Sequence, residues 1–309
     1  MNPLLATLGG KLTERWLNSL VLPGALFLAT TAVGTVMGHR HWHDVDRLRT
    51  TLDELAAHPA LDRTGTAALL VTFFLLAATA ASLGAQFLGN AIERWQLRFG
   101  RDPFSRARTT RRALRWRQRD AERTLAIEHA HRAGTGPGGA GTSANAALTR
   151  VQALTEARDR IALREPARPT WYGDRMQAAA DRVEAAYGVD LAVLWPRVWL
   201  ILPEPAVRRV QSAHDSFSSA ARLAAWAVGY ALLACWWWPA ALAAVGCALV
   251  ARSRARSALE ALAELIEAAV DVHGLELATR IGLLSPETPP GRLTQDTGDD
   301  MSALFRKAE

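Results

Sequence analysis

Four long apolar stretches interrupt an otherwise polar chain of 309 residues. The first two are Leu17–Met37 and Thr66–Gly89, and a closely spaced pair, Ala220–Trp238 and Pro239–Ala251, follows much later. A helix rises about 1.5 Å per residue, so about 20 apolar residues are needed to cross a hydrocarbon core about 30 Å thick. The pattern predicts an all-α, four-helix integral membrane protein with a helical cytoplasmic module between the second and third transmembrane helices.

The first apolar stretch has two interpretations. Lys11 and Arg15 precede it, as basic residues precede a secretory signal. The stretch is longer than the apolar region of a typical signal, and no clear cleavage site stands near its end. A retained transmembrane helix is therefore the preferred interpretation.

The distribution of charge predicts the orientation in the membrane. Eleven arginines and three acidic residues lie between Arg94 and Arg123, whereas the connection 38–65 has four arginines and five acidic residues. Loops rich in arginine near transmembrane ends stay in the cytoplasm. We therefore expect a multi-pass protein of the inner cell membrane, with both termini in the cytoplasm and 38–65 outside.

The last apolar pair predicts a helical hairpin that turns at Trp236–Pro239, because indoles suit a membrane interface and proline ends a helix. Its second arm is short, so a re-entrant hairpin remains the alternative. Small residues recur at every fourth position, a spacing that lets helices pack closely in lipid. On the hairpin these residues are Ala221, Ala225, Gly229, Ala240, Ala244 and Ala248, and on the second apolar stretch they are Ala77, Ala81, Ala85 and Gly89.

Composition divides the chain into six predicted segments. They are a cytoplasmic N-terminal segment (1–16), a first transmembrane pair (17–91), a cytoplasmic helical module (92–219) with a glycine-rich linker at 134–146, the hairpin (220–251), an amphipathic helix (252–284) and a disordered tail (285–309). We expect the helices flanking the linker to pair with each other. The end of the tail, Met301–Lys307, is interpreted as a frayed end or as a short docking peptide.

The arginine-rich segment Arg94–Arg123 is expected to contact anionic lipid headgroups, since it follows an apolar helix and basic residues are attracted to anionic membrane surfaces. A solvated helix that only satisfies the charge rule is the alternative. Nucleic acid is not an expected partner, because no aromatic stacking platform or nucleic-acid motif accompanies the arginines. The acidic face of the later amphipathic helix is predicted to be a partner of this segment; its residues are Glu260, Glu264, Glu267 and Asp271.

The stretch Pro169–Pro203 carries the most distinctive motifs. It resembles the cytoplasmic segment of a family of uncharacterised bacterial multi-pass membrane proteins, which reads P-T-x-x-G-[ND], then Y-G-x-D, then W-P-R and a closing L-P. The matching residues are Pro169, Thr170, Gly173, Asp174, Tyr187, Gly188, Asp190, Trp195, Pro196, Arg197, Leu202 and Pro203. The resemblance covers about 35 residues and the hairpin after them. It implies a membrane architecture and no activity.

The residues themselves predict structural roles within this stretch. Gly188 is expected to end a helix as its C-cap, and Asp190 is expected to pair with Arg197. The apolar segment Leu191–Leu202 contains Pro196, which is expected to break it. The segment would lie at the membrane interface or pack beneath the hairpin.

Candidate chemistry is sparse. His39, His41 and His43 alternate and could bind a metal, but their spacing matches no structural zinc pattern, and ordinary polar interfacial residues are the preferred interpretation. Cys235 and Cys247 are expected to be packing residues. No Ser/His/Asp or Cys/His arrangement is recognisable, so neither an enzyme nor a cofactor is predicted.

The sequence therefore favours a membrane scaffold or anchor that presents its cytoplasmic module to a protein partner or to its own copies. The alternative is an oligomeric membrane pore or channel-like effector, with the tryptophan-rich hairpin lining the path.

Overall fold

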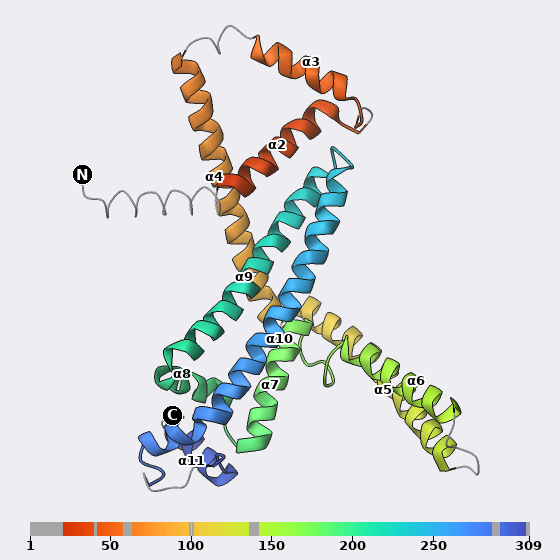
Figure 1. The fold of residues 1–309 in the computed structure, drawn as a ribbon, viewed down its shortest axis with the longest axis vertical. Helices are drawn as coiled ribbons and strands as arrows, with labels where there is room; N and C mark the ends of the chain where they lie inside the picture. Colours follow the sequence, from red (N-terminus) through yellow and green to blue (C-terminus); the bar gives the residue numbers. More distant parts are fainter. Residues whose placement is uncertain are drawn as a thin grey trace. The chain divides into compact units, whose positions relative to one another are not determined.

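The structure is a computed structural model that describes residues 21–39, 42–57, 64–98, 100, 102–135, 142–285 and 291–306. Within these ranges the chain forms ten α-helices and no strand, which confirms the predicted all-α class (Figure 1). The helices are α2 (Leu22–Met37), α3 (Val45–Ala56), α4 (Thr64–Leu97), α5 (Pro103–Thr135), α6 (Thr142–Asp159), α7 (Trp171–Tyr187), α8 (Leu191–Ile201), α9 (Glu204–Leu233), α10 (Ala240–Arg280) and α11 (Gln295–Phe305).

The chain divides into two compact units, each assembled from segments that are distant in sequence. The first unit contains Met1–Glu93 and Phe217–Ala255, and the second contains Arg94–Ser216 and Arg256–Glu309. Helices α9 and α10 contribute residues to both units. No helix boundary separates the predicted hairpin from the predicted amphipathic helix at 252, because α10 is continuous over Ala240–Arg280.

In the first unit, small residues and aromatic rings bring α2 against its neighbours. At Gly24 an added Cβ would lie 1.9 Å from the carbonyl oxygen of Ala78, so α2 and α4 cross at backbone contact. The ring of Phe27 has its centroid 5.5 Å from that of Trp226 and 5.3 Å from that of Tyr230, both on α9. Helix α2 therefore packs against both α4 and α9.

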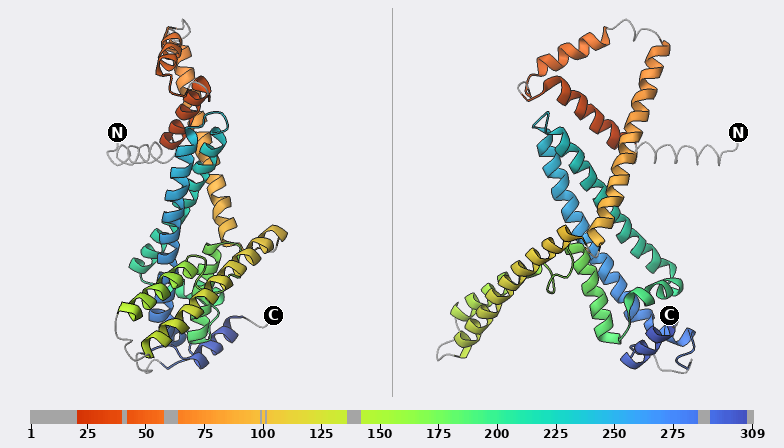
Figure 2. Two further views of the ribbon diagram at one scale, coloured as in Figure 1. Left: turned by 90° about the vertical axis from the view of Figure 1, so that its right-hand side faces the viewer. Right: turned by 180° about the vertical axis from the view of Figure 1, so that it is seen from behind.

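The hairpin of the first unit turns where α9 ends at Leu233 and α10 begins at Ala240, and the two helices run side by side from this turn (Figure 2). Trp237, in the turn, packs against Gly34 of α2. Of the small residues singled out in the sequence, Ala221, Ala225, Ala240 and Ala244 are buried, Gly229 lies beside Phe27, and Ala248 is exposed. On α4, an added Cβ at Gly89 would lie 2.9 Å from the Cα of Arg222, which brings α4 and α9 into close contact.

By length and composition, one helix among the described residues is able to cross a membrane: residues Gly65–Leu97 of α4, with a mean hydropathy of 2.1. Helices α2 and α8 are apolar but shorter. Among the described residues, length and composition together therefore support one of the four predicted crossings. Charge explains the difference on the hairpin, because Arg222 and Arg252 limit the uncharged run to 223–251, and the turn divides that run in two.

The second unit combines the paired helices α5 and α6, which lie side by side (Figure 2), with α7, α8, α11 and the later part of α10. Its fully buried side chains include Leu194, Val198, Leu259, Val270 and Met301. Helix α8 runs through Pro196 without a break, because a proline removes only one backbone donor and the helix continues on both sides. The prediction that Pro196 breaks this segment is therefore wrong.

The prediction of a disordered tail over 285–309 is also wrong for its later part. Residues Gln295–Phe305 form α11, whose N-cap is Thr294, and Gly298, Met301 and Ser302 are buried. The prolines and glycine at 286–291 dominated the composition on which the prediction rested. The N-cap, and buried residues spaced three and four positions along one side of the helix, are the local features of a packed helix.

Candidate functional site

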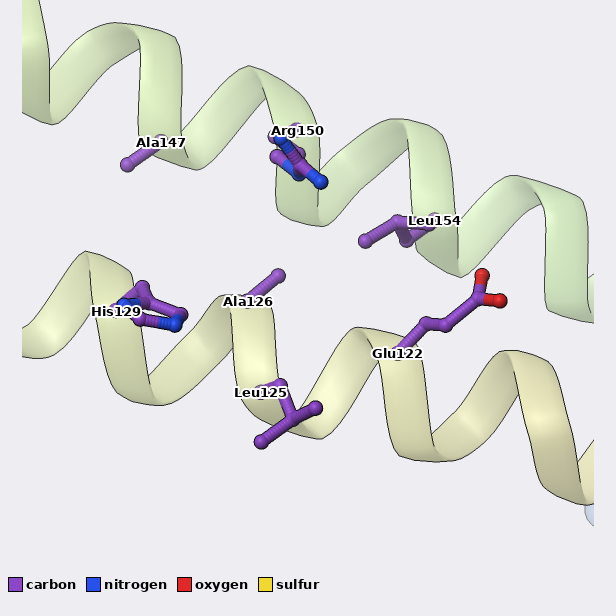
Figure 3. Close-up of a pocket in the computed structure, with 7 residues that line it drawn as sticks. All are labelled: Glu122, Leu125, Ala126, His129, Ala147, Arg150 and Leu154. Atoms are coloured by element: carbon purple, nitrogen blue, oxygen red, sulfur yellow. The ribbon is translucent and has the colours of Figure 1, made fainter.

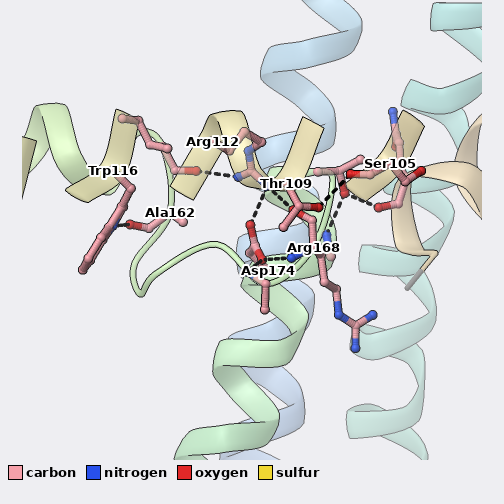
Figure 4. Close-up of polar contacts among 12 residues, drawn as sticks. Ser105, Thr109, Arg112, Trp116, Ala162, Arg168 and Asp174 are labelled. Carbon is pink, nitrogen blue, oxygen red and sulfur yellow. Dashed lines mark hydrogen bonds and ion pairs between the residues drawn. The ribbon is translucent and has the colours of Figure 1, made fainter. Parts of the chain in front are cut away.

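Most residues singled out by the sequence motifs lie at two positions in the second unit. The first position, the α5–α7 joint, is defined by Arg112, Trp116, Pro169, Thr170 and Asp174. Figure 4 shows Arg112, Trp116 and Asp174 of this joint. The second, the α11 seat, is defined by Tyr187, Gly188, Asp190, Arg197 and the side of α11 that they contact.

Asp174 is the centre of the α5–α7 joint. Its Oδ1 accepts the backbone N–H groups of Ala167 and Arg168, with N–O distances of 3.0 and 2.8 Å, and its Oδ2 lies 2.6 Å from Nη1 of Arg112. The residue is only 9% exposed. Burial raises the pKa of Asp174, while the charge of Arg112 and the backbone donors act in the opposite direction.

Side chains of α5 also satisfy carbonyl groups of the segment that precedes α7. Arg112 donates to the carbonyl oxygens of Arg168 and Ile161 at 2.6 and 2.7 Å, and Trp116 Nε1 donates to that of Ala162 at 2.9 Å. A non-helical segment needs such partners because its backbone groups lack helical ones. Arg112 thus links α5 to α7 and to the connection between α6 and α7 at once.

The motif that includes Thr170 and Gly173 forms the start of α7. The Thr170 hydroxyl accepts the N–H of Gly173 at 3.1 Å as the N-cap and donates to the carbonyl oxygen of Gln96. An added Cβ at Gly173 would lie 2.7 Å from Cδ of Arg168. Pro169 is fully buried and closely approaches Gly100, which has a φ of 66°. These motif residues shape the joint through a helix cap and close backbone packing.

Helices α7 and α10 are joined through Glu267. Its carboxylate accepts from Arg182, with an Nε–Oε2 distance of 2.9 Å, and from Nη1 of the buried Arg175 at 3.4 Å. Burial acts to raise the pKa of Glu267, but the hydrogen bonds and charges of the two arginines outweigh burial, so its pKa lies below the ordinary value. The acidic face of α10 therefore pairs with α7 at Glu267, and the prediction that α5 is its partner is wrong at this residue.

We expect this contact to weaken in acid. Because the pKa of Glu267 is lowered in the folded protein, its contribution is fully present above the ordinary glutamate pKa of about 4.3 and is lost as the pH falls through the lower folded value. The loss should be about 1 kcal/mol, as for a partly exposed ion pair. Unfolding free energies of the full chain, measured from pH 7 to pH 3, should fall less for Glu267→Gln than for the wild type, and equal slopes would contradict this assignment.

The α11 seat depends on two glycines. Gly188 is the C-cap of α7 with a φ of 68°, a conformation in which other residues are strained. An added Cβ at Gly298 of α11 would lie 1.7 Å from the carbonyl oxygen of Tyr187, so the backbones of α11 and of the α7 C-terminus are in direct contact. Ser302 Oγ lies 3.3 Å from the carbonyl oxygen of Gly188 and completes the contact.

Asp190 and Arg197 belong to the seat but do not pair with each other, so that prediction is corrected. Asp190 caps α8 by accepting the N–H of Ala192 at 3.0 Å, and its Oδ2 lies 3.6 Å from Nη2 of Arg306. The guanidinium carbon of Arg197 lies 4.5 Å from the ring centroid of Phe305. Both side chains therefore contact the C-terminal segment at Phe305 and Arg306, which was predicted to be part of a disordered tail.

The other motif residues of the seat lie beside these contacts. Tyr187 donates its hydroxyl to Asp271 of α10 at 2.7 Å, and burial together with this bond raises its pKa. The ring centroids of Trp195 and Trp199 are 5.8 Å apart, and Pro196 is exposed. The motif Y-G-x-D thus positions α7, α8 and α11 relative to one another.

An open cleft of about 500 Å³ lies between α5 and α6 (Figure 3). Figure 3 shows Glu122, Leu125, Ala126 and His129 along α5 facing Ala147, Arg150 and Leu154 along α6. Its lining combines one histidine, one carboxylate and one arginine with four apolar side chains. A paired acid and base, or an activated nucleophile, does not occur among these seven residues.

The candidate metal ligands are only partly described. His39 and His43 lie in the connection between α2 and α3, whereas His41 lies outside the described residues. In the ranges that the structure covers, no group of three or more His, Cys, Asp or Glu side chains could hold a metal ion. Cys235 and Cys247 are free thiols there.

No protein-family model, curated protein or solved structure matches this chain.

Several residues that form these joints were not recognised in the sequence. Arg112 is one of eleven arginines in its segment, and nothing in the sequence marks it as the partner of Asp174. Trp116 had a signal, because it is the only tryptophan of α5 and a buried indole needs an acceptor. Gly298 itself had no such signal, but the start of α11 did, because Thr294 is a favoured N-cap residue and the acidic Asp296 lies in the first turn.

Proposed function

We propose that this protein is an integral membrane scaffold or anchor that presents its second unit, in the cytoplasm, to a protein partner or to its own copies. The first unit crosses the inner membrane several times, with both termini inside. The observation that carries this proposal is the reversed polarity of the first unit, whose outward-facing side chains are large and apolar.

The exposed surface of the first unit supports a lipid environment. Most of the large apolar side chains that are exposed in the described ranges belong to this unit. On α4 they include Leu69, Val71, Phe73, Leu76, Leu83 and Phe87, and on α9 and α10 they include Leu232, Leu242, Val245 and Leu249. No Asp, Glu, Lys, Arg or His occurs at 64–92 or at 223–251. Contiguous apolar surface of this kind is rare on proteins that face water alone.

The second unit supports a presenting role. Its helices are held by charged joints at Asp174 and Glu267 and by the seat of α11, which are contacts typical of a water-exposed protein. Three clefts lie among the described residues of this unit, two beside α5 and α6 and one lined by side chains of α6, α7 and α10. Their lining residues form no recognisable catalytic arrangement.

Self-association and conductance together test this function. Two differently tagged full-length copies should cross-link through second-unit residues in membranes, and purified protein in liposomes should show no ion flux. Flux that is lost in Gly229→Leu and retained in Gly246→Leu would contradict the scaffold and support a pore. A Cβ added at Gly229 would lie 3.2 Å from the ring of Phe27, whereas one added at Gly246 would meet no atom within 4 Å. The two variants therefore make the same substitution at a packed and at an open position.

A further inference from the structure

The arginines of α5 fall into two groups with different surroundings. One group is engaged inside the second unit: Arg112 binds Asp174, and Nε of Arg123 lies 3.0 Å from Oγ1 of Thr155. The other group includes Arg111 and Arg115, which are exposed and make no side-chain hydrogen bond or ion pair with the residues that the structure describes. These two positive charges stabilise nothing within the fold.

The second group lies on one face of α5 together with aromatic residues. Phe104, Arg108, Arg111 and Arg115 are spaced by four, three and four residues, so they share a face, which we name the Phe104–Arg115 face. Phe104 is 70% exposed. The guanidinium carbon of Arg108 lies 5.0 Å from the ring centroid of Trp95. The face thus combines fixed positive charge with apolar rings at one end.

An open groove continues this face. It has a volume of about 490 Å³, and its lining includes Arg115, Arg119 and Arg160. Two of these arginines already pair with carboxylates: Arg119 with Glu122 at 2.8 Å, and Arg160 with Glu156 at 3.7 Å. Arg115 is therefore the arginine of this groove with room to bind an external anion.

We propose that the Phe104–Arg115 face binds the phosphate groups of lipids at an anionic membrane surface. The inference rests on the proposed function and names one partner of the second unit. Only 98–102 separate α4 from α5, a connection that spans at most about 22 Å between Leu97 and Pro103, so the face stays close to the end of the helix that is long and apolar enough to cross a membrane. Guanidinium groups bind phosphate oxygens, and aromatic rings favour the interface beside them.

The test uses full-length protein in an uncharged detergent, titrated with a short-chain phosphatidylglycerol and, separately, with the matching phosphatidylcholine. We expect preferential binding of phosphatidylglycerol that weakens as salt is added. Each arginine near an anionic lipid surface contributes about 5-fold in affinity. The double substitution Arg111→Gln with Arg115→Gln should therefore weaken binding about 25-fold, while its thermal unfolding stays at the wild-type value because neither side chain has an internal partner among the described residues.

The matched control removes the same charge from the other end of the paired helices, as Arg132→Gln with Arg150→Gln, and should bind like the wild type. Equal loss in both double variants would overturn the proposal in favour of general charge attraction. Unchanged binding after loss of Arg111 and Arg115 would overturn it as well. So would stronger binding of a single-stranded oligonucleotide, or displacement of the lipid by an equal concentration of inorganic phosphate. Failure of the proposed function is distinguishable, because it would appear as release of wild-type protein from membranes at alkaline pH.

Discussion

Replacing Asp174 with alanine should lower the unfolding free energy of the second unit by about 3–5 kcal/mol, the largest effect that we expect from one side chain. The substitution leaves the guanidinium of Arg112 largely buried without its carboxylate and two backbone N–H groups, of Ala167 and Arg168, without an acceptor. Urea unfolding of the full chain in detergent, together with hydrogen exchange of the amides at 161–175, measures the loss.

Two variants separate the charge from the hydrogen bonds. Asp174→Asn keeps an oxygen for the two backbone donors but not the charge, so its loss should be smaller than that of Asp174→Ala. Asp181→Ala is the matched control, because Asp181 is 30% exposed and its ion pair with Arg164 is 3.2 Å long. That control should cost less than about 1 kcal/mol. If Asp174→Ala also lowered the unfolding free energy by less than about 1 kcal/mol, the α5–α7 joint would not hold the unit together.

Gly298→Val should release α11 from its seat, the second large effect. A Cβ at this position would lie 1.7 Å from the carbonyl oxygen of Tyr187 and 2.6 Å from Cγ2 of Val189, and a backbone carbonyl cannot move aside as a flexible side chain can. Such overpacking costs about 1–3 kcal/mol or more. Protection of the amides at 295–305 from hydrogen exchange should fall to that of a helix without tertiary contacts, while protection of α7 decreases only near Gly188.

Gly246→Val is the control for this substitution. Gly246, like Gly298, lies within a helix, but a Cβ added at Gly246 would meet no atom within 4 Å. The control should leave the protection of α11 unchanged. Full protection of 295–305 in Gly298→Val would contradict the close contact between α11 and the end of α7.

The sequence predicted what depends on local patterns. Apolar periodicity and helix-forming composition were sufficient for the all-α class, and the C-cap role predicted for Gly188 from its residue type and position is confirmed. Such features need only a few neighbouring residues. For the same reason they say little about which distant segments meet.

The contacts across long sequence separations could not be predicted in this way. Arg112 meets Asp174 across 62 positions, and Arg182 meets Glu267 across 85. Many arginines and acidic residues could form such pairs, and charge alone does not choose among them. Asp190 and Arg197 were predicted to pair because they are close in sequence. Asp190 pairs instead with Arg306, and Arg197 packs over the ring of Phe305. The docking of α11 was missed because nearby prolines suggested a disordered tail.

The membrane topology of the full chain tests the central claim most directly. An accessible cysteine or short epitope inserted at 136–141, between α5 and α6, and another at 58–63, between α3 and α4, would be labelled from either side of sealed membranes after extraction at alkaline pH. The account predicts that the protein stays in the membrane, with 136–141 reached only from the cytoplasm and 58–63 only from outside. Release of the chain into the supernatant, or labelling of both sites from the same side, would contradict it.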